Sequence, residues 1–222
     1  MTKSTLFFGS IGTLVETSEM QRQAFNQAFH DMGLDWAWDV ATYKTMLSKS
    51  GGQARIEDYA AERGVPVDAV AVHKRKTELF NQAMVRDGLQ LRPGVDRILR
   101  SARDRDIVLG FVSSTSVENI VSIFKALGDQ LSPSDFDFIA DGSMVGKGKP
   151  APDIYWHALG VVDKRPQDCV AIEDTAVCLR SALNAGLHGV AFPNAFAARE
   201  DFEESVMIMD ETTTLDALLA AD

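Results

Sequence analysis

Short runs of apolar residues alternate with amphipathic stretches along most of the chain after Leu91. These runs are rich in β-branched and aromatic residues and are apolar on both faces, which is typical of a parallel sheet covered by helices on both sides. An earlier run, Leu6–Phe8, closes at Gly9 and predicts a further buried strand. The other predicted strands are Ile107–Val112, Phe136–Ala140, Cys169–Ile172, Gly189–Phe192 and Val206–Met209.

The segment between residues 16 and 88 has no strand pattern, and its apolar residues recur at helical spacing. One predicted helix ends near Gly33, a second runs through Ile56 to Glu62, and a third spans about Val67 to Val85. Because the first strand precedes this segment and the others follow it, both parts of the chain must complete one sheet. The sequence therefore predicts a Rossmann-like α/β core of residues 1–15 and 89–222, with a small all-helical cap of residues 16–88.

Composition narrows the class of protein further. A chain of 222 residues with 45% hydrophobic residues can bury one sizeable core and a small second lobe. Its net charge of -10 argues against a broad surface for nucleic acid or anionic membranes, which requires clustered Lys and Arg. The two cysteines, Cys169 and Cys178, lack metal-ligand spacing, and no apolar run approaches membrane-spanning length. We expect a cytoplasmic protein with neither a nucleic-acid nor a membrane partner.

Polar residues follow the predicted strands at the edge where ligands of parallel sheets bind. Each has a plainer interpretation, as a helix N-cap, a solvated lysine, or an acid favoured at a helix N-terminus. Ser116 is the better N-cap candidate for the helix that follows its strand, and Thr175 plausibly caps the next one. The candidate site residues of the core are Ser113, Ser114, Lys149, Glu173 and Asp174.

The phrase after the first strand resembles the first motif of the haloacid dehalogenase-like (HAD) hydrolases. In that family the strand ends in D-x-D-G-T-L, whereas this chain has Gly9-Ser10-Ile11-Gly12-Thr13-Leu14, so the two aspartates fall on Gly9 and Ile11. The resemblance implies that the first aspartate would attack phosphorus and ligate magnesium, while the second would serve as general acid and base. Neither glycine nor isoleucine can do either.

Two later phrases agree with the same family. Val112–Ser116 falls where the family has a Ser or Thr whose hydroxyl and backbone N–H hold phosphate, which implies this role for Ser113. Gly146–Asp153 matches the G-K-P-x-P-D phrase, which implies that Lys149 offsets charge between nucleophile and phosphate. Lys147, outside the matching position, is expected on the surface.

A third phrase concerns the metal. Cys169–Thr175 matches an apolar strand ending in E-D-S, whose carboxylates hold Mg²⁺ in the family; Cys178 stands where the family usually has glycine. Of the family's ligands only the Ile11 carbonyl, Glu173 and Asp174 remain, so we expect weak magnesium binding or none. The motif lysine would then pair with one of these carboxylates, or would still hold a phosphate or sulfate with the loop amides.

Within the family, the cap phrases look most like the CbbY-like branch, which is related to β-phosphoglucomutase and acts on small sugar phosphates. The matching segments are Gly12–Thr17, Arg22–Asn26, Gly33–Trp36, Gly51–Arg55, Lys76–Phe80 and Leu91–Val95. Arg55 and Lys76 are candidates for a second anionic group of the substrate, with exposed helix charges as an equal alternative. Gln21 stands where the branch usually has histidine. The full set of candidate substrate contacts is Glu16, Gln21, Arg55, Lys76, Ser113, Ser114 and Lys149.

Three hypotheses about function follow. The leading one is a degenerate HAD protein that keeps the fold, binds a small phosphorylated metabolite or another partner, and lacks the family's phosphotransfer. The alternative is a sugar-phosphate phosphatase that uses another nucleophile, such as water on a metal held by Glu173 and Asp174. A nucleotide-binding turn at Gly9 and Gly12 ranks lower, because the full G-x-G-x-x-G fingerprint is absent.

Overall fold

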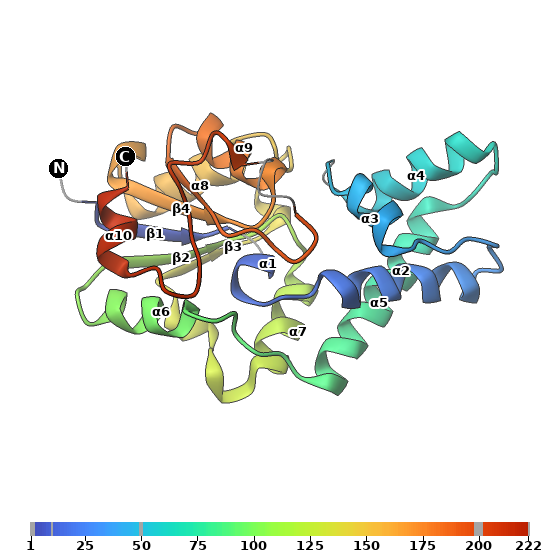
Figure 1. Ribbon diagram of the computed structural model, residues 1–222, viewed down its shortest axis with the longest axis horizontal. Coiled ribbons are helices and arrows are strands. Elements are labelled where there is room, and N and C mark those ends of the chain that lie inside the picture. Colours follow the sequence, from blue (N-terminus) through green and yellow to red (C-terminus); the bar gives the residue numbers. More distant parts are fainter. Residues whose placement is uncertain (1–2, 10, 49–50, 198–201, 222) are drawn as a thin grey trace.

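The computed structural model describes residues 3–9, 11–48, 51–197 and 202–221, so Ser10 of the first motif lies outside the described residues. A six-stranded parallel sheet forms the centre of the molecule, in the order β3-β2-β1-β4-β5-β6 (Figure 1). This confirms the Rossmann-like α/β core. The strands are β1 (Thr5–Phe8), β2 (Val108–Val112), β3 (Phe138–Ala140), β4 (Cys169–Glu173), β5 (His188–Ala191) and β6 (Met207–Ile208).

The first strand is central, and its side chains are buried on both faces of the sheet. Leu6 and Phe8 belong to one hydrophobic cluster with α6, α7 and α10, whereas Phe7 packs into another with α8 and α9 (Figure 1). This two-sided cover explains why the run is continuously apolar. These helices are α6 (Val95–Arg103), α7 (Val117–Leu127), α8 (Asp153–Val162), α9 (Ala176–Asn184) and α10 (Leu215–Ala220).

Two strands are shorter than the apolar runs that predicted them. β3 begins at Phe138, because the Asp137 carboxylate accepts a hydrogen bond from the Leu109 N–H at 2.7 Å in place of a ladder carbonyl. β6 contains only Met207–Ile208, which lies at the sheet edge beside β5. The other strands differ from prediction by one residue at one end, or at both ends in β5.

Four helices, α2–α5, lie to one side of the sheet and form the cap (Figure 1). Their core is a cluster of aromatic rings in which Trp38 packs against Phe25, Phe29 and Tyr59, with ring centroids 4.7–5.4 Å apart. The helix α3 was not predicted. The cap helices are α2 (Ser18–Asp31), α3 (Val40–Met46), α4 (Gly52–Arg63) and α5 (Ala69–Asp87); α1 (Ile11–Leu14) precedes them.

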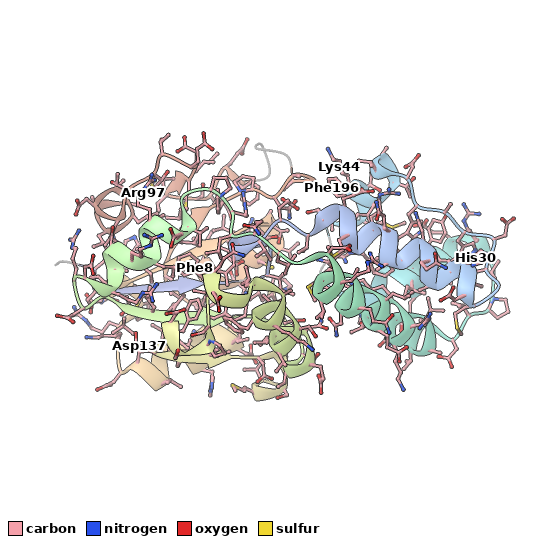
Figure 2. The ribbon with its side chains drawn as sticks, turned by 90° about the horizontal axis from the view of Figure 1, so that it is seen from below. Phe8, His30, Lys44, Arg97, Asp137 and Phe196 are labelled. Carbon is pink, nitrogen blue, oxygen red and sulfur yellow. The ribbon has the colours of Figure 1, made fainter. Side chains whose placement is uncertain are left out.

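The chain enters and leaves the cap at adjacent points. Val15 and Leu91 form an antiparallel bridge, and the Arg92 N–H donates to the Leu14 carbonyl at 2.8 Å. A second contact joins the cap to the loop after β5, where Phe196 packs edge-on against Tyr43 and lies beneath the Lys44 ammonium (Figure 2). The division at residues 15/16 and 88/89 stays a prediction. Within the described ranges, the helices are all too short or too polar to span a bilayer.

Candidate functional site

A cavity of about 470 Å³ lies between the carboxyl ends of the strands and the cap. The helix N-caps predicted from the sequence help to position its wall: the Ser116 and Thr175 side chains accept from the N–H groups of Asn119 and Cys178, three residues on. The cavity brings together sequence candidates from both lobes. Those lining it are Gly9, Ile11, Gln21, Arg55, Lys76, Ser113, Ser114, Lys149 and Asp174.

Two candidates are not among the lining residues. Glu173 is completely buried at the end of β4. Glu16 is exposed, and its carboxylate accepts hydrogen bonds from the backbone N–H groups of Ser18 and Ala195, at 2.8 and 2.7 Å. Glu16 thus ties the start of the cap to the loop after β5, and its role as a substrate contact stays a prediction.

Lys149 forms a buried ion pair with Glu173, as expected for a site without the first aspartate. The Lys149 ammonium donates to Glu173 Oε1 at 2.6 Å, to the Val112 carbonyl at 2.9 Å and to the Gly9 carbonyl. Tyr155 donates its hydroxyl to the same carboxylate oxygen at 2.6 Å. An ammonium has three hydrogens, so all donors of Lys149 are used within the protein.

Burial dominates the electrostatics of this network. It raises the pKa of Glu173, an effect that the nearby Lys149 ammonium opposes. It also raises the pKa of Tyr155 well above its ordinary value, and the adjacent Glu173 charge adds to this, so the phenol stays a proton donor. Tyr155 was missed in the sequence, although it lies two residues after the aspartate of the P-x-P-D phrase.

Other side chains fill the space beside Gly9. A Cβ atom added to Gly9 would overlap Glu173 Oε1 and the Tyr155 hydroxyl. The carboxylate that a first-motif aspartate would carry is thus replaced by the end of Glu173, which reaches in from β4. An aspartate at position 9 would fit only if Glu173 moved.

Ser113 is buried where β2 ends, and its backbone N–H and hydroxyl oxygen both form hydrogen bonds within the protein. Its backbone N–H donates to the Ala140 carbonyl at 2.9 Å in the sheet, and the phosphate contact expected at Ser113 stays a prediction. Its hydroxyl oxygen accepts from the Thr115 N–H at 3.2 Å and keeps its own proton to donate. Ser114 is exposed and Lys147 is exposed, the latter as predicted.

The cap contributes a cluster of cationic side chains to the cavity. Lys76 is only 6% exposed, so its interpretation as a surface charge was wrong. Its ammonium lies 4.8 and 4.7 Å from the ring centroids of Phe25 and Phe80 and donates to Gln21 Oε1 at 3.1 Å. Burial, helped by the charge of Arg55, lowers the pKa of Lys76 to about 7.

Arg55 and His73 lie in the same cluster. Arg55 is half-buried and donates to the Met46 carbonyl at 3.0 Å. His73 also lines the cavity, and its pKa is lowered by burial and by the charges of Lys76 and Arg55. His73 was not predicted from the sequence, although its place three residues before Lys76 puts both side chains on one face of α5.

A Rossmann-like sheet with polar strand ends, a helical cap and a cavity between them lined by basic side chains define the class of cap-bearing α/β proteins. The haloacid dehalogenase-like hydrolase family matches residues 4–186. CbbY from Cereibacter sphaeroides is 34% identical over 220 residues, which cover 98% of this chain and 96% of that protein. The chain therefore belongs to the haloacid dehalogenase-like hydrolase family, and within it to the CbbY-like branch.

Solved structures agree with this assignment. The crystal structure of CbbY from Rhodobacter sphaeroides in complex with phosphate superposes with a TM-score of 0.87 at 34% identity, covering 98% of this chain and 99% of that one. A CbbY variant from the same organism in complex with xylulose-(1,5)bisphosphate gives a TM-score of 0.88 at the same identity and coverage. A CBBY-like protein from Arabidopsis thaliana is 31% identical over 93% of this chain and 68% of that protein.

Hydrolases of this family generally use Mg²⁺, and the residues present here do not fit that ion. Magnesium requires near-octahedral oxygen ligands. Glu173 Oε1 is engaged by Lys149 and Tyr155, and Asp174 accepts from the Asn194 side-chain amide at 2.9 Å. Among the described residues, the thiol of Cys178 lies close enough to the two carboxylates to bind a metal together with them.

Proposed function

We propose that this chain binds a small phosphorylated metabolite without carrying out the family's phosphotransfer. The observation that supports this most directly lies at Gly9, where a nucleophile is missing and the Glu173 carboxylate and Tyr155 hydroxyl occupy its place. One oxygen of that carboxylate is paired with Lys149 and Tyr155, which does not suit it to attack phosphorus in place of the aspartate. An aspartyl-phosphate intermediate has no residue on which to form at this position.

The cap supplies the positive charge for the ligand in this proposal. Lys149 is saturated by protein acceptors, whereas the described contacts of the Lys76 ammonium are a neutral amide and two rings. Lys76, Arg55 and His73 face a cavity whose volume of about 470 Å³ is ordinary for a small-molecule site. Xylulose 1,5-bisphosphate, the ligand of a CbbY relative, is therefore the first compound to test.

The test is release of inorganic phosphate from xylulose 1,5-bisphosphate with Mg²⁺, beside calorimetric titration of the same compound. We expect the natural protein to bind the compound and to release no phosphate above background. The Gly9→Asp/Ile11→Asp variant restores both motif carboxylates and is expected to release phosphate, provided that Glu173 yields its position to the new side chain.

The single variant Ile11→Asp is the matched control, because it restores the acid-base carboxylate without the nucleophile and should stay inactive. Phosphate release by the natural protein that disappears in Asp174→Ala would contradict the proposal and support a hydrolase with an unconventional nucleophile. Absence of binding to both the bisphosphate and inorganic phosphate would contradict the binding function itself.

A further inference from the structure

One oxygen of the central carboxylate has no partner among the described residues. Glu173 is fully buried; its Oε1 accepts from both Lys149 and Tyr155, while its Oε2 accepts no hydrogen bond. A buried carboxylate oxygen left unpaired is costly, and such atoms in folded proteins commonly mark an ion or water site. The second oxygen of Glu173 is therefore a candidate position for a bound ion or water.

Two further donors surround this carboxylate. Ligand atoms of Glu173, Asp174 and Cys178 all lie within 4.8 Å of one another. Glu173 ends β4, and Cys178 lies in the first turn of α9, which begins after the N-cap Thr175. Asp174 and Cys178 also line the cavity, so an ion can reach the cluster from solvent.

We propose that Glu173, Asp174 and Cys178 form a site for a thiophilic divalent cation, Zn²⁺ in chemical class, in place of the family's magnesium site. Sulfur combined with carboxylate oxygen suits zinc and is a poor set for magnesium. Tetrahedral ligands at zinc bond lengths lie about 3.3–3.8 Å apart, so separations of up to 4.8 Å need to contract by roughly 1–1.5 Å at most.

Two residues at this site differ from the family pattern, and the two differences favour the same kind of metal ion. Gly9 removes a hard oxygen ligand from the family pattern, and Cys178 adds a soft sulfur ligand where the family usually has glycine. On binding, a sulfur–metal bond forms and the thiol proton leaves to solvent. The two carboxylates and the thiolate then balance the charges of the ion and of Lys149. A fourth coordination position stays open towards the cavity for water or a ligand oxygen.

Titration of the whole purified chain with Co²⁺ or Zn²⁺ alone tests this site, with Co²⁺ as the spectroscopic probe. We expect one equivalent to bind, with a near-ultraviolet sulfur-to-cobalt charge-transfer band, and excess Mg²⁺ to leave the band intact. Cys178→Ala should abolish the band and weaken Zn²⁺ binding at least tenfold. Cys169→Ala is the matched control, since Cys169 is buried at the far end of β4, and it should keep the band.

Cys178→Ser keeps the side-chain size but removes the sulfur donor, so it separates loss of this metal ligand from loss of the fold. Circular dichroism monitors the fold in every variant. Zn²⁺ should raise the melting temperature of the natural protein and not that of Cys178→Ser. Absence of one-to-one binding, equal affinity in the Cys178 variants, or displacement by equimolar Mg²⁺ would overturn the proposal. Because phosphate binding is measured separately, this outcome would leave the proposed function standing.

Discussion

Lys149→Met should lower the free energy of unfolding by about 3–5 kcal/mol, because it removes one partner of a fully buried ion pair. The substitution leaves the Glu173 carboxylate without its counter-charge, and the Gly9 and Val112 carbonyls lose a donor. Methionine fills most of the volume of the lysine chain, so the loss reports on charge and hydrogen bonds. Urea unfolding at neutral pH, followed by circular dichroism, measures it.

Lys147→Met is the matched control, since Lys147 lies two residues away in the same loop and is exposed. It should change stability by no more than about 0.5 kcal/mol. The double variant Lys149→Met/Glu173→Gln removes both charges and should recover part of the loss. Equal stabilities for the Lys147 and Lys149 variants would show that the buried pair does not hold the strand ends together.

The elements that depend on local pattern could be predicted from the sequence. Apolar runs located all six strands, and Ser116, Thr175 and Gly33 lie at the helix ends where they were expected. Signals of this kind depend only on neighbours along the chain. The short helix Val40–Met46 was not predicted, because its two turns contain too few apolar residues to show a helical period.

The site could be predicted only as far as its residue types. The sequence showed that Gly9 lacks a carboxylate, but only the fold shows that Glu173, from a strand far along the chain, reaches into that place. Likewise, Lys76 has polar neighbours in sequence, and its burial between Phe25 and Phe80 depends on how α2 and α5 pack. Contacts between distant segments decide which charges are paired.

Two of the buried lysines, Lys149 and Lys76, differ in this respect, and the difference bears on function. Lys149 has a carboxylate partner and is part of the permanent structure. Lys76 is equally buried, but its described contacts are an amide oxygen and two aromatic rings, which repay desolvation less well than a carboxylate. A buried ammonium held in this way beside a cavity is suited to an anion that arrives from outside.

Lys76→Met should therefore stabilise the protein near neutral pH while weakening its binding of bisphosphate. A pKa of about 7 in place of 10.5 corresponds to a penalty on the order of 5 kcal/mol for keeping Lys76 charged. Contacts of the ammonium with Phe25 and Phe80 offset about 1–2 kcal/mol of it. We expect a net gain in the free energy of unfolding of about 3 kcal/mol.

The stability gained by Lys76→Met should depend on pH, because Lys76 has different pKa values in the folded and unfolded chains. Below about pH 7 both folded and unfolded chains carry the Lys76 proton, so the penalty is fully present and the gain from Lys76→Met is largest. As pH rises from about 7 towards 10.5, the folded protein releases the proton while the unfolded chain keeps it, so the penalty and the gain both shrink. Urea unfolding of both proteins at several pH values within this range measures the trend.

Lys74→Met serves as the control, because Lys74 is exposed on the same helix and should change neither stability nor binding appreciably. In calorimetry at neutral pH, Lys76→Met should weaken the binding of xylulose 1,5-bisphosphate at least tenfold, a loss of about 1.4 kcal/mol in binding free energy. Lys74→Met should leave this affinity unchanged. A Lys76→Met protein that is less stable than the natural one below pH 7 would show that the ammonium is held by the fold itself. The cap cluster would then be structural, and the anion would have to bind elsewhere in the cavity.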